Sequence, residues 1–192
     1  KQRGLIRMKN AFLFVDIQRD FCPGGALAVA DGDSVVPVAN RLSALAARHG
    51  CPAFFSRDWH PANHVSFAAS GGPWPPHCVA QTPGAQFADG LTLPPESRVI
   101  SKGTSPDRDA YSAFDRTGLA ELIRRTGAER LFVCGLATDY CVAATVKDAL
   151  TEGFAVSVVQ DGCRAVNVSP SDGDRALEEM RRAGALLTDS AA

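Results

Sequence analysis

The fold is indicated most clearly by Leu131-Phe132-Val133-Cys134-Gly135-Leu136-Ala137-Thr138-Asp139-Tyr140-Cys141-Val142, where an apolar run leads into a helix-prone segment that continues to Glu152. This stretch predicts a buried β-strand that turns directly into a helix. Cys141 falls in the first turn of that helix, where free N–H groups and the positive end of the helix dipole favour a thiolate. Cys141 is therefore a candidate nucleophile, although a small buried cysteine that only packs would fit the same stretch.

Strand-like and helix-like segments alternate along the rest of the chain. Short apolar runs predict strands at residues 11–17, 53–56, 98–101, 130–134, 155–160 and 185–187. Helical spacing of apolar residues predicts helices at residues 35–49, 119–126, 139–152 and 171–183. Such alternation is typical of an α/β fold, so we expect three layers, αβα, around a mainly parallel sheet of roughly six strands with Rossmann-like topology.

Length and composition favour one globular enzyme-sized domain. The 192 residues are enough for a single core. We expect a short N-terminal tail at residues 1–8 and one domain at residues 9–192. The stretch at about residues 59–96 interrupts the regular alternation and is rich in Gly, Pro, Trp and His, so it is expected to be a functional loop insertion.

Charge and cysteine usage limit the kinds of partner. The formal net charge is −1, which argues against a nucleic-acid or anionic membrane partner. No apolar run is long enough to span a bilayer. The six cysteines are scattered without CxxC spacing and are expected to be free thiols. These features predict a cytoplasmic protein.

Chemically capable side chains follow the predicted strands at their carboxyl ends. The first strand runs into Asp16, the second into Asp58-Trp59-His60, the third into Lys102, and the fourth into the turn before Cys141. In open parallel sheets, ligands bind at this edge. We therefore expect these side chains to line one site.

A thiol nucleophile needs a base that takes its proton and an acid that protonates the leaving group. Asp16 can perform both tasks if the ammonium of Lys102 lies close enough to hold it ionised and to stabilise the thiolate. Taken separately, Asp16 could be a capping residue and Lys102 a solvated surface charge. Their joint placement with Cys141 favours a catalytic role.

A metal site is predicted beside this group. Asp58 and His60 are two residues apart and point the same way from an extended segment, and His77 in the long loop supplies a third ligand. One carboxylate and two imidazoles suit Zn, with Fe or Mn as alternatives. His64 could be a ligand, a hydrogen-bond partner or an exposed loop residue, and a non-ligand role is favoured. Three unrelated loop residues would also fit the spacing.

Five stretches, at residues 15–27, 56–67, 72–79, 101–104 and 135–142, together make the chain recognisable. In this order they resemble the nicotinamidases and pyrazinamidases of the isochorismatase-like cysteine hydrolase superfamily, along nearly the whole chain. The resemblance implies a metal-containing amidohydrolase that converts nicotinamide to nicotinate and ammonia, and pyrazinamide to pyrazinoate, through a thioester. It further implies a role in NAD salvage and an assembly that is often a homo-oligomer.

The resemblance also implies roles for individual residues. The catalytic triad is Asp16, Lys102 and Cys141, and the metal ligands are Asp58, His60 and His77. The backbone N–H groups of Ala137 and Cys141 form an oxyanion hole, with a cis peptide between Leu136 and Ala137. Phe21 and Trp74 line the pocket for the pyridine ring, whereas Trp59 is expected to be structural.

Three other hypotheses remain open on the sequence. One is an amidase for a different small amide or carbamoyl compound. A second is a metal-binding module without catalysis, which would require a broken triad. A third is a dinucleotide-dependent oxidoreductase, which the absence of GxGxxG in the first strand-to-helix turn makes weak.

Overall fold

A computed structural model of the chain describes residues 8–191, and the tail predicted for residues 1–8 lies outside the described residues except for Met8. The centre is one six-stranded sheet in the order β3-β2-β1-β4-β5-β6, and every neighbouring pair is parallel. The strands are β1 (Asn10–Val15), β2 (Ala53–Asp58), β3 (Arg98–Lys102), β4 (Arg130–Leu136), β5 (Ala155–Arg164) and β6 (Leu186–Thr188).

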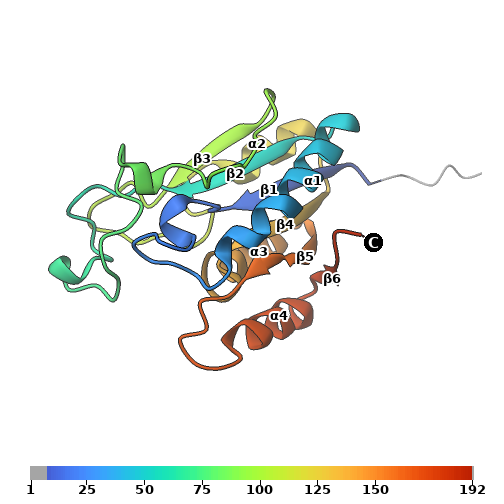
Figure 1. The fold of residues 1–192 in the computed structure, drawn as a ribbon. Helices are drawn as coiled ribbons and strands as arrows, with labels where there is room; N and C mark the ends of the chain where they lie inside the picture. The colour runs from blue at the N-terminus through green and yellow to red at the C-terminus, as the bar shows by residue number, and fades with distance from the viewer. Residues whose placement is uncertain (1–7, 192) are drawn as a thin grey trace, which may run out of the picture.

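Helices cover both faces of the sheet. They are α1 (Val35–Arg48), α2 (Leu119–Thr126), α3 (Ala143–Thr151) and α4 (Asp172–Arg182). Helix α1 lies on one face, and α2 and α3 lie on the other (Figure 1). This division follows from right-handed crossovers. The connections from β1 to β3 run toward one edge of the sheet, whereas those from β3 to β6 run toward the other edge, so their helices lie on opposite faces. The predicted three-layer parallel architecture is confirmed. Within residues 8–191, no helix has the length and apolar character needed to cross a membrane.

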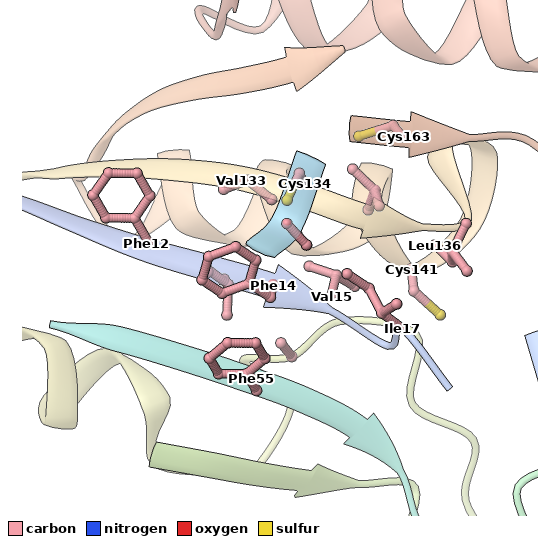
Figure 2. Close-up of a cluster of buried hydrophobic side chains, with 14 of the residues drawn as sticks. Phe12, Phe14, Val15, Ile17, Phe55, Val133, Cys134, Leu136, Cys141 and Cys163 are labelled. Atoms are coloured by element: carbon pink, nitrogen blue, oxygen red, sulfur yellow. The ribbon is translucent and has the colours of Figure 1, made fainter. Parts of the chain in front are cut away.

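The core explains why these segments form central strands. Strand β1 is buried along nearly its whole length, as expected for a parallel strand covered on both faces. Phe14 of β1 stacks on Phe55 of β2 with ring centroids 4.4 Å apart, and Phe12 stacks on Phe132 of β4 at 5.2 Å. Figure 2 shows the rings of Phe12, Phe14 and Phe55 along β1 and β2, with Cys141 farther along, near Leu136.

Three boundaries differ from the sequence-based expectation in ways that matter for the site. Strand β2 continues to Asp58, whereas β1 ends at Val15 because Asp16 turns away with φ +48°. The predicted helix over residues 139–152 begins instead with a π-helical turn, Thr138–Val142, in which the N–H of Val142 donates to Ala137 O at 3.1 Å. The periodicity of side chains could not distinguish this wider turn from the first turn of an α-helix.

The segment between β2 and β3 is a packed loop. It contains the short 3₁₀ turns Ala68–Ser70 and Pro83–Ala85, and an isolated bridge joins His60 to Val79. The side chains of His60, His64 and His77 are all buried in it. The loop therefore forms a fixed wall over one end of the sheet.

Candidate active site

The carboxyl edge of the sheet gathers the four side chains that the strand ends predicted. Asp16 follows β1, Asp58 and Lys102 end β2 and β3, and Cys141 lies in the π-helical turn after β4. Because β1, β2, β3 and β4 are adjacent and parallel, their carboxyl ends converge. All four side chains are buried.

Lys102 lies at the centre of this group. Its Nζ is 2.9 Å from Asp16 Oδ2 and 2.5 Å from Asp58 Oδ1, and it donates to Ala110 O at 2.9 Å. The same nitrogen is 3.4 Å from Cys141 Sγ. Burial alone would lower the pKa of Lys102, but the two carboxylates outweigh burial and raise that pKa well above its ordinary value. Lys102 is therefore an ammonium that contacts Cys141, Asp16 and Asp58 together.

The two carboxylates around Lys102 differ in basicity. Burial raises the pKa of Asp16 despite the nearby ammonium, and the negative charge of Asp58 adds to the rise. For Asp58, burial is outweighed by Lys102 and His60, so its pKa lies well below the ordinary value. Environments that push two carboxyl pKa values apart assign them different tasks. Asp16 is the one suited to accept and return a proton.

Cys141 rests as a thiol. Burial raises the pKa of Cys141 well above its ordinary value, and the attraction of Lys102 does not compensate. Desolvation of the buried sulfur thus opposes the stabilisation of a thiolate that is expected from the helix terminus. The sulfur therefore needs a base. Asp16 Oδ1 accepts from Ser56 Oγ at 2.6 Å, and Oδ2 has no aligned hydrogen bond within residues 8–191. One carboxylate oxygen of Asp16 lies within 4.8 Å of Cys141 Sγ.

Asp58, His60 and His77 form a cluster that fits a metal ion. One ligand atom from each lies within 4.8 Å of the others, and all three side chains are buried. His60 Nδ1 is bonded to Gly103 O at 2.8 Å and His77 Nδ1 to Pro75 O at 2.8 Å, which directs each Nε2 toward the cluster. Burial also lowers the pKa of His77, so its imidazole is neutral as ligation requires.

A second cluster, of Asp16, Asp58 and Cys141, has similar spacing, but a side chain already lies among its members. The ammonium of Lys102 lies within 3.4 Å of an atom of each of these residues. A metal ion there would have to displace a buried cation that already satisfies both carboxylates. Of the two clusters, therefore, the one with Asp58, His60 and His77 fits a metal ion, whereas the one with Asp16, Asp58 and Cys141 surrounds the ammonium of Lys102.

His64 belongs to the support of the site. It is fully buried, stacks on His60 with ring centroids 4.0 Å apart, and uses Nδ1 with Ser66 Oγ and Nε2 with Arg108 O. Both ring nitrogens are engaged, which agrees with the favoured non-ligand role. The alternative of an exposed loop residue is wrong. The Arg57 guanidinium stacks on the Trp59 ring at 3.7 Å, and Trp59 does not line the cavity described next.

A cavity opens over Cys141 and the cluster of Asp58, His60 and His77. Its wall is mainly apolar and aromatic, and includes Phe21, Leu27, Val29, Trp74, Ala110, Tyr111, Ala137, Tyr140 and Val166. Trp74 Nε1 donates to the hydroxyl of Tyr111 at 3.0 Å, and the Trp74 and Tyr140 rings meet edge to face at 5.2 Å. A flat aromatic ring fits such a wall.

The sequence analysis missed two of these aromatic residues and one polar one. Tyr140 directly precedes Cys141, and that adjacency could have marked it. Tyr111 lies in the segment after Lys102, for which the sequence offered no role. Ser56 lies inside a strand and had no signal at all, because its contact with Asp16 depends on strand pairing.

The turn before Cys141 also takes the shape implied by the resemblance. The Leu136–Ala137 peptide is cis. Ala137 and Cys141 both line the cavity.

Comparison with known proteins agrees with this geometry. Residues 10–192 match the isochorismatase domain family. The chain is 46% identical to the nicotinamidase of Escherichia coli (strain K12), over 93% of each chain. Among solved structures, the pyrazinamidase of Pyrococcus horikoshii in complex with zinc has a TM-score of 0.90 and 46% identity, covering 94% of this chain and 99% of that one. PnC1 from L. infantum in complex with nicotinate has a TM-score of 0.90 and 40% identity, covering 96% and 94%.

Proposed function

Since the chain belongs to the isochorismatase family, we propose that it is a nicotinamidase, a cysteine hydrolase that converts nicotinamide to nicotinate and ammonia. It is expected to act on pyrazinamide as well, as the pyrazinamidase relative indicates. The single observation that carries this proposal is the contact of one buried ammonium, Lys102, with Cys141, Asp16 and Asp58 beneath an aromatic cavity. That arrangement places a thiol nucleophile, its base and a pocket that fits an aromatic ring next to one another.

The proposed reaction begins with proton transfer. Asp16 takes the proton of Cys141, and the sulfur attacks the carboxamide carbon of the substrate. The oxyanion of the tetrahedral intermediate accepts hydrogen bonds from the backbone N–H groups of Ala137 and Cys141. Lys102 compensates the negative charge that moves between Asp16 and the sulfur.

The second half returns the proton and releases the acid. Asp16 gives its proton to the departing nitrogen, the C–N bond breaks, and ammonia leaves a thioester on Cys141. Water then attacks the thioester carbon with Asp16 as base. The C–S bond breaks, nicotinate leaves, and the proton held by Asp16 restores the thiol.

Asp58, His60 and His77 are proposed to hold one divalent metal ion. Zinc is the first choice, since the P. horikoshii relative was solved with zinc and an O,N,N set suits it, and Fe or Mn would also fit. When bound, the metal would supply a Lewis acid that orients the substrate ring through its pyridine nitrogen, directly or through a bound water. The chain's own contribution is the aromatic clamp of Phe21 and Trp74.

The cellular setting is also proposed. All six cysteines are free thiols, which supports a reducing compartment, the cytoplasm. Hydrolysis of nicotinamide there would feed nicotinate into NAD salvage. The domain is proposed to cover residues 9–192, with residues 59–96 as its metal-binding insertion, and the active protein could be a homo-oligomer.

Purified protein should release ammonia from nicotinamide, measured with a coupled enzymatic assay. We expect similar turnover of pyrazinamide and much slower turnover of N-carbamoyl compounds, because the aromatic wall favours a flat ring. A preference for an N-carbamoyl substrate would replace the proposed substrate while keeping the thiol mechanism. No ammonia from any of the three amides, in protein that retains its metal and its fold, would contradict the proposal.

Replacement of His77 by alanine should remove metal and weaken substrate binding. Loss of one of the three ligands is expected to lower zinc affinity at least about 10-fold and to raise KM for nicotinamide. Cys141 should still react with iodoacetamide, since Asp16 and Lys102 are unchanged. The matched control is His49→Ala, because His49 is exposed just after α1. Undiminished metal content in His77→Ala would contradict the assigned ligand set.

A further inference from the structure

The main-chain N–H and C=O groups of Asp58 lie where β1 no longer continues beside β2. The last paired residues of these strands are Phe14 and Phe55, and β2 continues for three more residues beyond this pair, whereas β1 ends at Val15. Asp58 pairs with Lys102 of β3 on one side. On the side of β1, its N–H and C=O groups face a place where no strand continues. Buried backbone groups need partners, so a side chain must supply them.

Gln18 supplies both partners. Its Oε1 accepts from the N–H of Asp58 at 2.8 Å, and its Nε2 donates to Asp58 O at 2.8 Å. Nε2 also donates to Ala85 O at 2.9 Å. The side chain is fully buried, and these bonds fix the orientation of the amide, because only the oxygen can accept from an N–H group. The amide thus makes the two main-chain hydrogen bonds with Asp58 that a longer β1 would otherwise make.

These bonds act on the part of the site that is predicted to hold metal. Asp58 Oδ1 is already held by Lys102 at 2.5 Å, and Oδ2 lies 3.5 Å from His60 Nε2. The direction of the carboxylate toward the histidines therefore depends on where its main chain is held. Ala85, the second partner of Gln18, lies in the loop that follows His77, so one amide ties two ligand-bearing segments together.

The neighbouring Asp20 acts in the same direction. Its Oδ2 accepts from the N–H of Cys78, the residue after His77, at 2.7 Å. Asp16, Gln18 and Asp20 are spaced two residues apart, and each secures a different part of the site. The segment between β1 and α1 is thus built around the metal cluster as well as around the triad.

We propose that Gln18 is a positioning residue for the metal ion, which holds Asp58 in the ligating geometry through main-chain hydrogen bonds. The inference rests on the metal site of the proposed function and adds a determinant of its affinity. A ligand set held in place binds without an ordering cost, and partners beyond the ligands typically change metal affinity about 10–100-fold. Gln18 touches neither substrate nor metal, so its effect should be on binding rather than on the chemistry of Cys141.

The test uses metal-free full-length protein and Zn²⁺ with a competing chromophoric chelator. Gln18→Met removes all three hydrogen bonds at similar size, and Gln18→Glu keeps the acceptor for the Asp58 N–H but loses the donor to two carbonyls. We expect the Kd for Zn²⁺ to rise at least about 10-fold in both variants. The increase in Tm that Zn²⁺ produces should shrink, while the rate of Cys141 alkylation in metal-free protein stays near wild type.

Ser43→Ala is the matched control for the loss of a buried polar side chain. Ser43 Oγ donates to Asn40 O and Thr92 O on the far side of α1. This variant should lower Tm equally with and without Zn²⁺ and leave the Kd unchanged. Folded Gln18 variants with a wild-type Kd for Zn²⁺ would overturn the proposal, and should Gln18→Met not fold, Gln18→Glu decides. Because nicotinamide is absent from these measurements, a failed substrate assignment would not affect the result.

Discussion

Cys141→Ala should abolish nicotinamide hydrolysis, with kcat lowered at least about 10⁴-fold. The reason is that the proposed route passes through a bond between this sulfur and the substrate carbon, and the other buried groups cannot form that bond. Lys102, Asp16 and Asp58 remain in place, so the fold and the metal cluster should persist. Initial rates of ammonia release and the metal content of the purified variant would be measured together.

The matched control for this variant is Cys51→Ala. Cys51 is a free thiol two residues before the start of β2, at the opposite end of the sheet from the site. Its loss should change kcat less than about 2-fold, as expected for a site remote from the chemistry. Mass spectrometry after a short reaction with substrate should find an acyl group on wild-type Cys141 and none in Cys141→Ala. Near-normal rates in Cys141→Ala would end the thiol mechanism and leave the metal as the centre of the chemistry.

Asp16→Asn should lower kcat about 10²–10⁴-fold, the usual range for loss of a general acid–base. Asparagine has the same shape and can still accept from Ser56, but it cannot take the proton of Cys141. The stability of the site should be largely retained, because Lys102 keeps its 2.5 Å contact with Asp58. Steady-state kinetics at several pH values would measure the effect.

The dependence of kcat/KM on pH should show whether Asp16 acts as the base. Asp16 must be ionised to act, and burial raises its pKa above the ordinary value of 3.8. In the wild type, kcat/KM should therefore be full above this raised pKa and should fall as pH drops through it. The acid limb should vanish in Asp16→Asn. Asp161→Asn is the control, because its carboxylate bonds to Ser190 and not to the site. An unchanged acid limb in Asp16→Asn would assign the base to another group.

Much of the fold could be predicted from local sequence because the signals were local. Parallel strands buried on both faces read as continuous apolar runs, and helices with one exposed face show helical spacing. The predicted helix over residues 119–126 agrees with α2, and the six expected strands are all present. The boundaries that were wrong depend on tertiary structure. Strand β2 continues to Asp58 because β3 and Gln18 satisfy its backbone, and β1 ends early at Val15 because Asp16 turns away.

The site divides in the same way. The types of the reactive residues and their positions at strand ends were readable, since a parallel sheet brings its carboxyl ends to one edge. The protonation states were not, because they depend on burial: Cys141 is a thiol and Asp16 a weakened acid only after water is excluded from both. The sequence analysis placed Lys102 beside Asp16 and Cys141 but did not predict its contact with Asp58. That contact joins the predicted catalytic triad to the predicted metal site.

What the sequence by itself determined was the order of the strands and helices and the chemical identity of the groups at one edge. Only the tertiary structure decided which of these groups share a partner: Lys102 with two carboxylates and a sulfur, Gln18 with the backbone of Asp58, and His64 with His60. The physical reason is that local pattern records which face of a segment is apolar, whereas hydrogen bonds and pKa values depend on distances between segments that meet only when the chain has folded.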